Sequence, residues 1–243
     1  MMTKNLLLAA LPRESRDRLE RISRRVDLTH GKILHHPNQA IETVYFPLNC
    51  LISITVTMAE GRTVEAGAVG SREMVGVNAF MGGRETNQTQ YVCQVPGSAV
   101  MMAAQPLLDE FDEVKGVRDV LLRFVQAYIA QLSQNVACNR VHTVEQRLAR
   151  WLLEVRDRLG TDDVGVTHEF IGQMLGTRRA GVSDAAKGLQ ERGLLEYGRK
   201  NLRVIDADGL GRVACECFQV LRDEYDRLLK PMILENNDLP QTL

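Results

Sequence analysis

The chain has 243 residues, of which 44% are hydrophobic and 25% are charged, and this composition is typical of a soluble globular protein. Its length allows one large domain or two smaller ones. The net charge of −1 excludes a protein that binds nucleic acid through its overall charge, so any basic binding surface must be local.

The first predicted element is a helix over residues 3–27, in which Leu19, Ile22 and Val26 recur at spacings of three and four. The segment LLLAAL near its start is similar to the core of a signal peptide. It continues, however, into a charged amphipathic pattern without a small-residue cleavage site. No apolar run approaches the length of a membrane span. We therefore expect no membrane contact and a cytoplasmic location.

Residues 32–102 change to short runs rich in Val, Ile, Thr and Tyr, separated by turn residues, which is a pattern of β-strands. The runs are TVYF, LISITVTM, RTVEAGAV, QYVCQV and SAVMM. Gly61 lies in a short connection between two of them, where a hairpin turn requires a positive φ. Several strands without alternating helices predict an antiparallel sandwich or barrel.

A long helix is predicted from Pro106 to Asn139. Its apolar side chains follow a three–four rhythm, at Val117, Leu121, Phe124, Tyr128 and Leu132. Two interpretations remain open: the stripe packs on the chain's own β domain, or it is the self-complementary seam of a dimer. The length of the helix favours the dimer interface.

A shorter helix is predicted over residues 144–159, capped by Thr143. The segment THEFIGQMLGTRRAGVSDAAKGLQERG then contains two short helical patterns that meet at a glycine. Gly172 is small where the helices must cross closely, Gly176 suits a left-handed turn, and Val182 is a buried position of the second helix. This spacing is typical of a helix-turn-helix, although a tight helical hairpin gives a similar pattern.

A candidate DNA-contacting surface lies on the exposed side of the second helix and on the hairpin that follows it, LLEYGRKNLRVID. A helix-turn-helix followed by such a two-stranded wing is typical of a winged helix. An arginine in the first turn of the second helix can bridge guanine O6 and N7, while short donors and wing cations suit phosphates. The alternative is an ordinary solvated polar face. The predicted contacts are Thr167, His168, Arg178, Arg179, Ser183, Lys187, Arg199 and Lys200.

The chain contains five scattered cysteines, an odd number without paired CxxC spacing: Cys50, Cys93, Cys138, Cys215 and Cys217. A disulfide framework or a four-thiolate zinc site is therefore not expected. Cys215 and Cys217 fall in a predicted final helix over Leu210–Leu229, where residues two apart point to different faces. We predict ordinary reduced residues and no metal site, with a redox or metal role as the alternative.

The order of these elements resembles the Crp/Fnr family of bacterial transcription regulators, most closely in QRLARWLL, in VTHEFIGQMLGTRRAGVSDAAKGLQERGLLE and in the wing. The resemblance implies an α+β fold with an N-terminal antiparallel β-roll (jelly-roll) sensor domain, a long dimerisation helix and a C-terminal winged helix-turn-helix. The implied division is 1–110 for the sensor domain with its N-terminal helix, 111–139 for the dimerisation helix, 140–212 for the DNA-binding domain and 213–243 for a C-terminal helix and tail.

The recognition helix departs from the family pattern at two positions. The family's arginine falls on Arg179 and its lysine on Lys187, whereas Ala180 replaces a glutamate and Asp184 a second arginine. Because side chains on this helix contact bases, we expect a DNA sequence that differs from that of the best-known member.

The sensor region departs further from the family's cyclic-nucleotide cassette. Glu73 corresponds to the glutamate that holds the ribose, but the phosphate position, Asn87 to Thr89, has no arginine, and Arg84 is out of register. A cyclic phosphate then loses roughly 1.5–3 kcal/mol of charge-assisted hydrogen bonding, so the sequence disfavours a cyclic nucleotide. Glu73, Arg84 and Thr89 are the candidate effector residues, and the effector and any cofactor stay unidentified. The sequence also lacks the N-terminal cysteine cluster of iron–sulfur sensors.

These features predict a homodimeric transcription regulator that binds an inverted repeat in double-stranded DNA and contacts RNA polymerase. The sequence shows no nucleophile elbow, phosphate loop or metal-spaced His/Glu set, so no enzyme is predicted. The alternative is a small-molecule sensor whose winged helix serves as a protein-binding adaptor.

Overall fold

The computed structural model describes residues 4–61, 63–83, 89–198 and 202–236, and for His168 and Glu169 the backbone alone. The helices are α1 (Leu6–Ala9), α2 (Arg13–Ile22), α3 (Ala104–Glu113), α4 (Lys115–Val141), α5 (Val144–Leu159), α6 (His168–Met174), α7 (Arg179–Glu191), α8 (Ala207–Val213) and α9 (Cys217–Asn236). The strands are β1 (Arg24–Leu28), β2 (Ile33–His35), β3 (Thr43–Pro47), β4 (Leu51–Thr57), β5 (Thr63–Val69), β6 (Thr89–Val95), β7 (Gly97–Ala103), β8 (Asp163–Val164), β9 (Leu195–Tyr197) and β10 (Leu202–Val204), and η2 (Val77–Phe80) is a 3-10 turn. None of the described helices is long and apolar enough to cross a bilayer.

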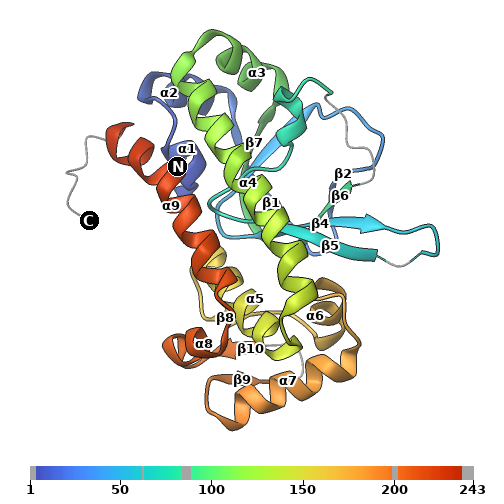
Figure 1. The fold of residues 1–243 in the computed structure, drawn as a ribbon. Helices are drawn as coiled ribbons and strands as arrows, with labels where there is room; N and C mark the ends of the chain where they lie inside the picture. The colour runs from blue at the N-terminus through green and yellow to red at the C-terminus, as the bar shows by residue number, and fades with distance from the viewer. Residues whose placement is uncertain (1–3, 62, 84–88, 199–201, 237–243) are drawn as a thin grey trace.

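The N-terminal domain is a sandwich of two antiparallel sheets, with strand orders β1-β7-β3 and β2-β6-β4-β5 (Figure 1). The register places Val44 opposite Met102 in one sheet and Ile52 opposite Val69 in the other, and all four side chains are buried. The five runs predicted as strands form β3 to β7, and Gly61 has a φ of +83° in the turn after β4. These predictions are confirmed.

The predicted single helix over residues 3–27 is wrong, because this segment forms α1, α2 and β1. Pro12 is extended at the start of α2, and Ser23, with φ −92° and ψ 161°, ends that helix. Val26 then pairs with Ala99 of β7, so its backbone is satisfied by the sheet rather than by a helix. The three–four spacing of Leu19, Ile22 and Val26 does not distinguish a helix that continues to Val26 from a helix that ends before a strand.

The predicted long helix is divided at Val114, whose φ of −110° and ψ of 105° are extended. The second part, α4, runs the length of the β domain to the C-terminal domain (Figure 1). One face of α4 is buried against the sandwich and against α1 and α9. The long helix thus carries part of the chain's own core.

The C-terminal domain consists of α5 to α8 and a small sheet with strand order β8-β10-β9. Thr143 starts α5 with a capping box: its hydroxyl accepts from the backbone N–H of Gln146, whose side chain reaches back to Thr143. Trp151 and Leu152 of α5 lie in the same core as Val182 and Leu189 of α7. α5 therefore supports α7, and it also packs against α8.

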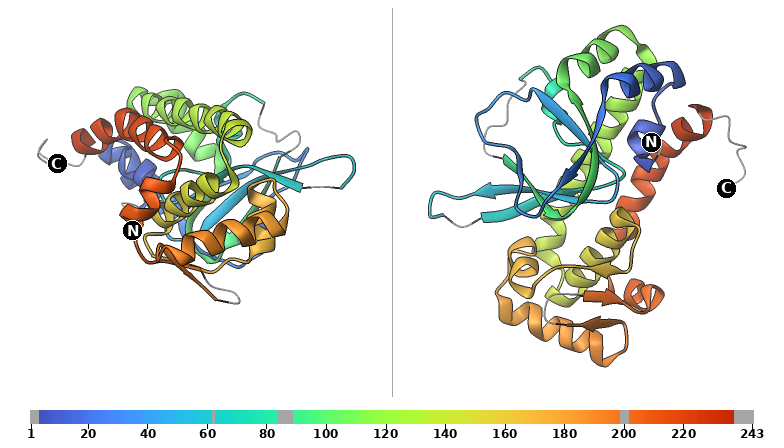
Figure 2. Two further views of the ribbon diagram at one scale, coloured as in Figure 1. Left: turned by 60° about the horizontal axis from the view of Figure 1, so that its bottom comes forward. Right: turned by 180° about the vertical axis from the view of Figure 1, so that it is seen from behind.

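The last helix, α9, returns from the C-terminal domain and packs along α4 (Figure 2). The Tyr225 hydroxyl donates to Gln131 Oε1 of α4 at 3.1 Å, and Asn236 Nδ2 donates to the Ala10 carbonyl at 2.8 Å. The predicted helix Leu210–Leu229 is wrong in its extent, because the chain leaves helical geometry between Val213 and Cys217.

Candidate nucleic-acid interface

A tight turn joins α6 and α7. Thr167 caps α6 by accepting the N–H of Phe170 at 3.2 Å, and Gly176 ends it with a φ of +58°. The Thr177 N–H then donates to the Gly172 carbonyl at 2.9 Å. A Cβ on Gly172 would lie 3.0 Å from the Thr177 carbonyl oxygen, so a larger residue would have to displace the backbone of the turn by a few tenths of an ångström. Both predicted glycine roles are confirmed.

The second helix of the pair, α7, has one apolar and one polar face. Val182, Ala185, Ala186 and Leu189 are buried against the rest of the C-terminal domain. The other face exposes Arg178, Arg179 and Lys187, together with Ala180 and Asp184. This exposed surface is cationic although the whole chain is slightly acidic.

Two polar residues on α7 have partners within the helix. The Ser183 hydroxyl donates to the Arg179 carbonyl at 3.1 Å, and Lys187 Nζ lies 3.7 Å from Glu191. Both side chains of the Lys187 pair are well exposed, so the pair contributes little to stability.

The remaining predicted DNA contacts are only partly described. Thr167 is exposed at the start of α6, while nothing is described of the His168 side chain. Arg199 and Lys200 lie outside the described residues. On the adjoining strand β10, Arg203 is exposed and lies 3.8 Å from Asp163 of β8. The two strands of the predicted wing are thus present as β9 and β10.

A groove of about 1020 Å³ separates the N-terminal end of α7 from the β4–β5 hairpin of the β domain. Met58, Thr63 and Val64 line one side of it, and the segment from Gly176 to Gly181, with Arg178 and Arg179, lines the other. The end of α7 predicted to contact bases therefore faces the hairpin in this arrangement of the two domains.

Glu73, the predicted ribose ligand, is completely buried and paired with the chain itself. Its Oε1 accepts from Arg158 Nη2 of α5 at 3.0 Å, and its Oε2 accepts the N–H of Gly70 at 2.5 Å. Both oxygens are therefore occupied at the junction between the two domains, where the packing is so close that a Cβ on Gly70 would meet Arg158 Cβ at 2.5 Å.

The other predicted effector residues do not join Glu73. Thr89 starts β6 and pairs with Val56 of β4, and Arg84 lies outside the described residues. Glu73 and Thr89 belong to different surroundings, because the first is enclosed by α5 and the second lies at a strand end. The described residues thus do not assemble the predicted effector site.

The predicted dimer stripe on α4 faces inward. Val117, Leu121 and Phe124 are completely buried within the chain, Tyr128 packs on the β-sandwich core, and Leu132 contacts Gly67 of β5. The stripe packs on the chain's own β domain, as the less favoured interpretation had it. The interface prediction is therefore corrected for Val117, Leu121, Phe124 and Tyr128, whereas Leu132 is only half-buried and stays a prediction.

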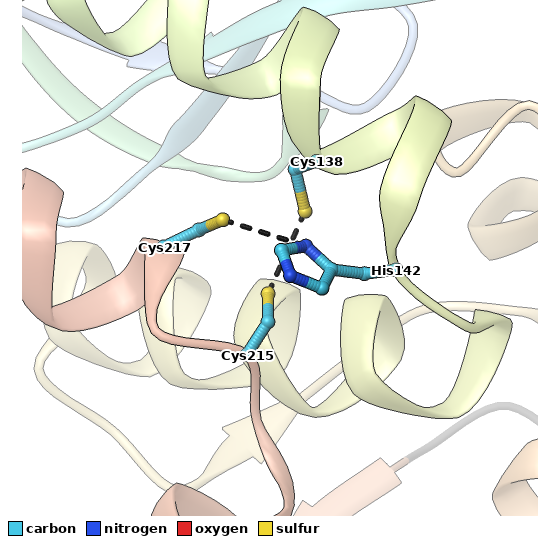
Figure 3. A group of neighbouring side chains, drawn as sticks. All are labelled: Cys138, His142, Cys215 and Cys217. Carbon is cyan, nitrogen blue, oxygen red and sulfur yellow. Dashed lines mark hydrogen bonds between the residues drawn. The ribbon is translucent and has the colours of Figure 1, made fainter.

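Three of the five cysteines meet, which the sequence did not predict. Cys138 of α4, Cys215 and Cys217 converge with His142, the residue that follows α4 (Figure 3). The prediction that Cys215 and Cys217 point to different faces of a helix is wrong, because Cys215 lies in the extended link before α9. Two spacings in the sequence could have indicated this cluster. They are C-x-C for Cys215 and Cys217, and C-x3-H for Cys138 and His142.

Comparison with known proteins agrees with this geometry. A family model described as a Crp-like helix-turn-helix domain matches residues 146–213, which span α5 to α8. A relative, the CRP-like cAMP-activated global transcriptional regulator of Mycobacterium tuberculosis, is 24% identical over 197 residues, covering 78% of this chain and 87% of the relative.

Solved structures share the fold. FixK2 from Bradyrhizobium japonicum has a TM-score of 0.68 at 15% identity, covering 80% of this chain and 98% of that protein. A putative Crp/Fnr-family regulator from Eubacterium rectale has a TM-score of 0.64 at 16% identity, covering 84% and 94%. The β-sandwich, the long helix and the helix-turn-helix domain occur in the same order as in the predicted fold. Residues 146–213 therefore match a Crp-like helix-turn-helix domain, and the chain shares its overall fold with these solved regulators.

Proposed function

We propose that the protein is a homodimeric regulator that reads an inverted repeat in double-stranded DNA through α7. The observation that carries this proposal is the exposed cationic face of α7, in which Arg178, Arg179 and Lys187 lie opposite the buried Val182 and Leu189. A helix with this division can enter the major groove while its apolar face stays in the domain. Ala180 and Asp184, both exposed on α7, support a DNA sequence particular to this protein.

The dimer in this proposal forms along an apolar face of α4 that the chain itself leaves uncovered. Leu122, Ile129 and Val136 are 50%, 55% and 74% exposed and recur every seven residues. Val125 and Leu132 lie at the edge of this face and complete a three–four spacing. That spacing is the pattern of a two-helix seam, so a second copy of α4 fits the face.

The β domain is proposed to act as the sensor and to change the access of α7 to DNA. Support comes from the groove shared by the β4–β5 hairpin and the Arg178–Arg179 end of α7, and from the Glu73–Arg158 pair at the domain junction. We divide the chain into a sensor (1–110), a dimer helix (111–139), a DNA-binding domain (140–212) and a C-terminal segment (213–243). A cytoplasmic location and a contact with RNA polymerase belong to the same proposal.

Selection from a random duplex library followed by a salt titration tests this function. The selected sites should be inverted repeats with half-sites about one helical turn, ~34 Å, apart. Affinity for random duplex should fall steeply with salt, and replacing Arg199 and Lys200 by alanine should flatten that dependence. Arg179→Ala should cost about 1–3 kcal/mol on the selected site and spare most binding to random duplex.

Arg21→Ala provides the matched control, because Arg21 is an exposed arginine at the end of α2, in the other domain. It should leave both affinities unchanged. A folded protein without affinity for any duplex at low salt would contradict the proposal and favour the adaptor function. Equal losses on selected and random DNA for Arg179→Ala would show that Arg179 contacts phosphate alone.

A further inference from the structure

A compact cluster of metal-binding side chains lies where α4 ends and α9 begins. Cys138 and His142 come from the end of α4, Cys215 comes from the link before α9, and Cys217 is the first residue of α9. All four side chains point toward one another (Figure 3). One ligand atom from each residue lies within 4.8 Å of every other. Each cysteine is less than one-twentieth exposed, and His142 is partly buried.

The distances match a single tetrahedral ion. With Zn–S bonds of about 2.3 Å, the edge between two thiolates of a tetrahedron is about 3.8 Å long, and a mixed sulfur–nitrogen edge is slightly shorter. Cys138 Sγ lies 3.5 Å from Cys215 Sγ, and Cys217 Sγ lies 3.6 Å from His142 Nδ1. Two of the six edges therefore have about the length that an ion requires, and none of the other four is longer than 4.8 Å.

The surrounding residues hold the ligands in the way that metal sites require. His142 Nε2 lies 3.3 Å from a carboxylate oxygen of Glu216, which leaves Nδ1 directed at the cysteines. A histidine ligand that donates its other ring N–H to a carboxylate has a fixed tautomer and orientation. Gln134 Nε2 donates to Cys217 Sγ at 3.0 Å and would stabilise a thiolate there.

The charge near the cluster also suits thiolates. The buried guanidinium of Arg150 interacts electrostatically with all three cysteines. Three thiolates and one imidazole around a divalent cation carry a net charge of about −1. Arg150 offsets that charge inside the protein.

The chemistry and the size of the cluster select zinc. Three thiolates and an imidazole are soft to borderline ligands, which disfavours Mg²⁺ and Ca²⁺. An iron–sulfur cluster needs room for several irons and bridging sulfides, so it holds some ligands farther apart than the edge of a one-ion tetrahedron. We propose that Cys138, His142, Cys215 and Cys217 bind one Zn²⁺ ion, which fastens the end of α4 to the start of α9.

The location gives this ion a mechanical role. His142 is the residue between α4 and the Thr143 cap of α5, and Cys215 is in the link between α8 and α9. These are the two places where the backbone crosses between the C-terminal domain and the α4–α9 pair. A bound ion would fasten both crossings together, and this role holds whether or not the domain binds DNA.

Metal analysis of the full chain, purified without a histidine tag, tests the proposal. We expect one zinc per chain after dialysis, and after exchange to Co²⁺ we expect the visible ligand-field bands of a tetrahedral thiolate site. Cys138→Ser and His142→Ala should abolish stoichiometric zinc, whereas Cys93→Ser, a buried thiol of β6, should retain it. Chelation should lower the Tm of the wild-type protein and of Cys93→Ser, but not that of His142→Ala.

Glu216→Gln separates a metal site from a cluster of packed thiols. Glu216 is a positioning residue with a side chain that is 71% exposed, so its replacement should leave the fold intact. We expect the zinc affinity to fall roughly 10- to 100-fold in a competition with a chromogenic chelator. Circular dichroism would confirm that each variant is folded. A folded wild-type protein that takes up no zinc, equal zinc in the wild type and His142→Ala, iron with inorganic sulfide, or a Cys138–Cys215 disulfide would each overturn the proposal.

Discussion

Arg158 shows how one side chain joins the two domains. It is buried in α5, it contacts Glu73 of the β domain, and it also lies 3.4 Å from Glu154 one turn earlier on α5. Burial lowers the pKa of Arg158, but the two carboxylates outweigh burial, so its pKa is raised overall and it stays charged. A buried cation with two carboxylates is stable as a group and costly to break.

We predict that Arg158→Met destabilises the protein by about 3–5 kcal/mol, because it leaves the Glu73 carboxylate buried without its cation. Denaturant unfolding would measure the change. Arg156→Met is the matched control on the same helix: Arg156 pairs with Asp162 in an exposed position, and its loss should cost less than about 1 kcal/mol. Adding Glu73→Gln to Arg158→Met should recover part of the loss. A cost for Arg158→Met no larger than that of the control would contradict the argument.

Glu65 of β5 predicts a pH dependence of stability. Burial raises its pKa to about 7, although the hydrogen bond from Ser53 opposes the shift. Because the folded pKa exceeds the unfolded value of about 4.5, the folded state binds more protons than the unfolded state between these values. The contribution of Glu65 to stability is therefore largest below about pH 4.5 and is lost as the pH rises through 7.

We expect Glu65→Gln to be more stable than the wild type at pH 8, by up to about 3 kcal/mol, and to differ little from it at about pH 4.5. Unfolding curves at the two pH values provide the measurement. Glu60→Gln, at the exposed tip of the same hairpin, should show the same stability difference at both. If the stability difference between Glu65→Gln and the wild type is the same at both pH values, the Glu65 carboxyl ionises normally in the folded protein.

At the scale of single elements, α4 has two apolar faces, of which the chain covers only one. One holds the side chains buried under the sandwich and α9, and the other holds Leu122, Ile129 and Val136 in the open. Periodicity detects an apolar face but not what covers it. The sequence pattern therefore predicted correctly that the helix is packed, but it assigned the dimer interface to the face that the chain itself buries.

Ile129→Glu should weaken self-association by roughly 100-fold or more, because each dimer would bury two like charges in an apolar seam. Sedimentation equilibrium would report the shift from dimer to monomer. Val220→Glu is the matched control, since Val220 is an exposed apolar side chain of α9, 47% accessible, away from the seam. Dimerisation that survives Ile129→Glu would place the interface elsewhere.

Elements with local signals were predictable from the sequence. The capping box at Thr143, the cap at Thr167 and the glycines of the turn act within a few residues, so α5 to α7 could be predicted with their boundaries nearly as found. Strand β1 could not, because its conformation depends on β7, which lies more than seventy residues later. The break before α9 also has no strong local breaker.

At the scale of the whole molecule, contacts between residues far apart in the chain determine the features that the sequence did not predict. Glu73 was predicted to hold a ribose, but α5 returns eighty-five residues later and occupies this carboxylate with Arg158. Cys138 and Cys215 are seventy-seven residues apart and meet only because α9 folds back along α4. Contacts between residues so far apart in the chain produce no pattern in the residue spacing. The helix-turn-helix is formed by residues close together in the chain, so the sequence could predict it.

The fold-back of α9 has a topological consequence. The chain enters the C-terminal domain after His142 and leaves it at Cys215, and both points lie within one side-chain cluster. Residues 143–214 therefore form an insertion between two neighbouring helices rather than a domain at the end of a string. Such a domain can rotate about its point of attachment, but it cannot move away without separating α4 from α9. In the proposed dimer, any signal from the β domain is thus restricted to changing the orientation of the helix-turn-helix domain, and the distance of that domain from the dimer axis stays nearly constant.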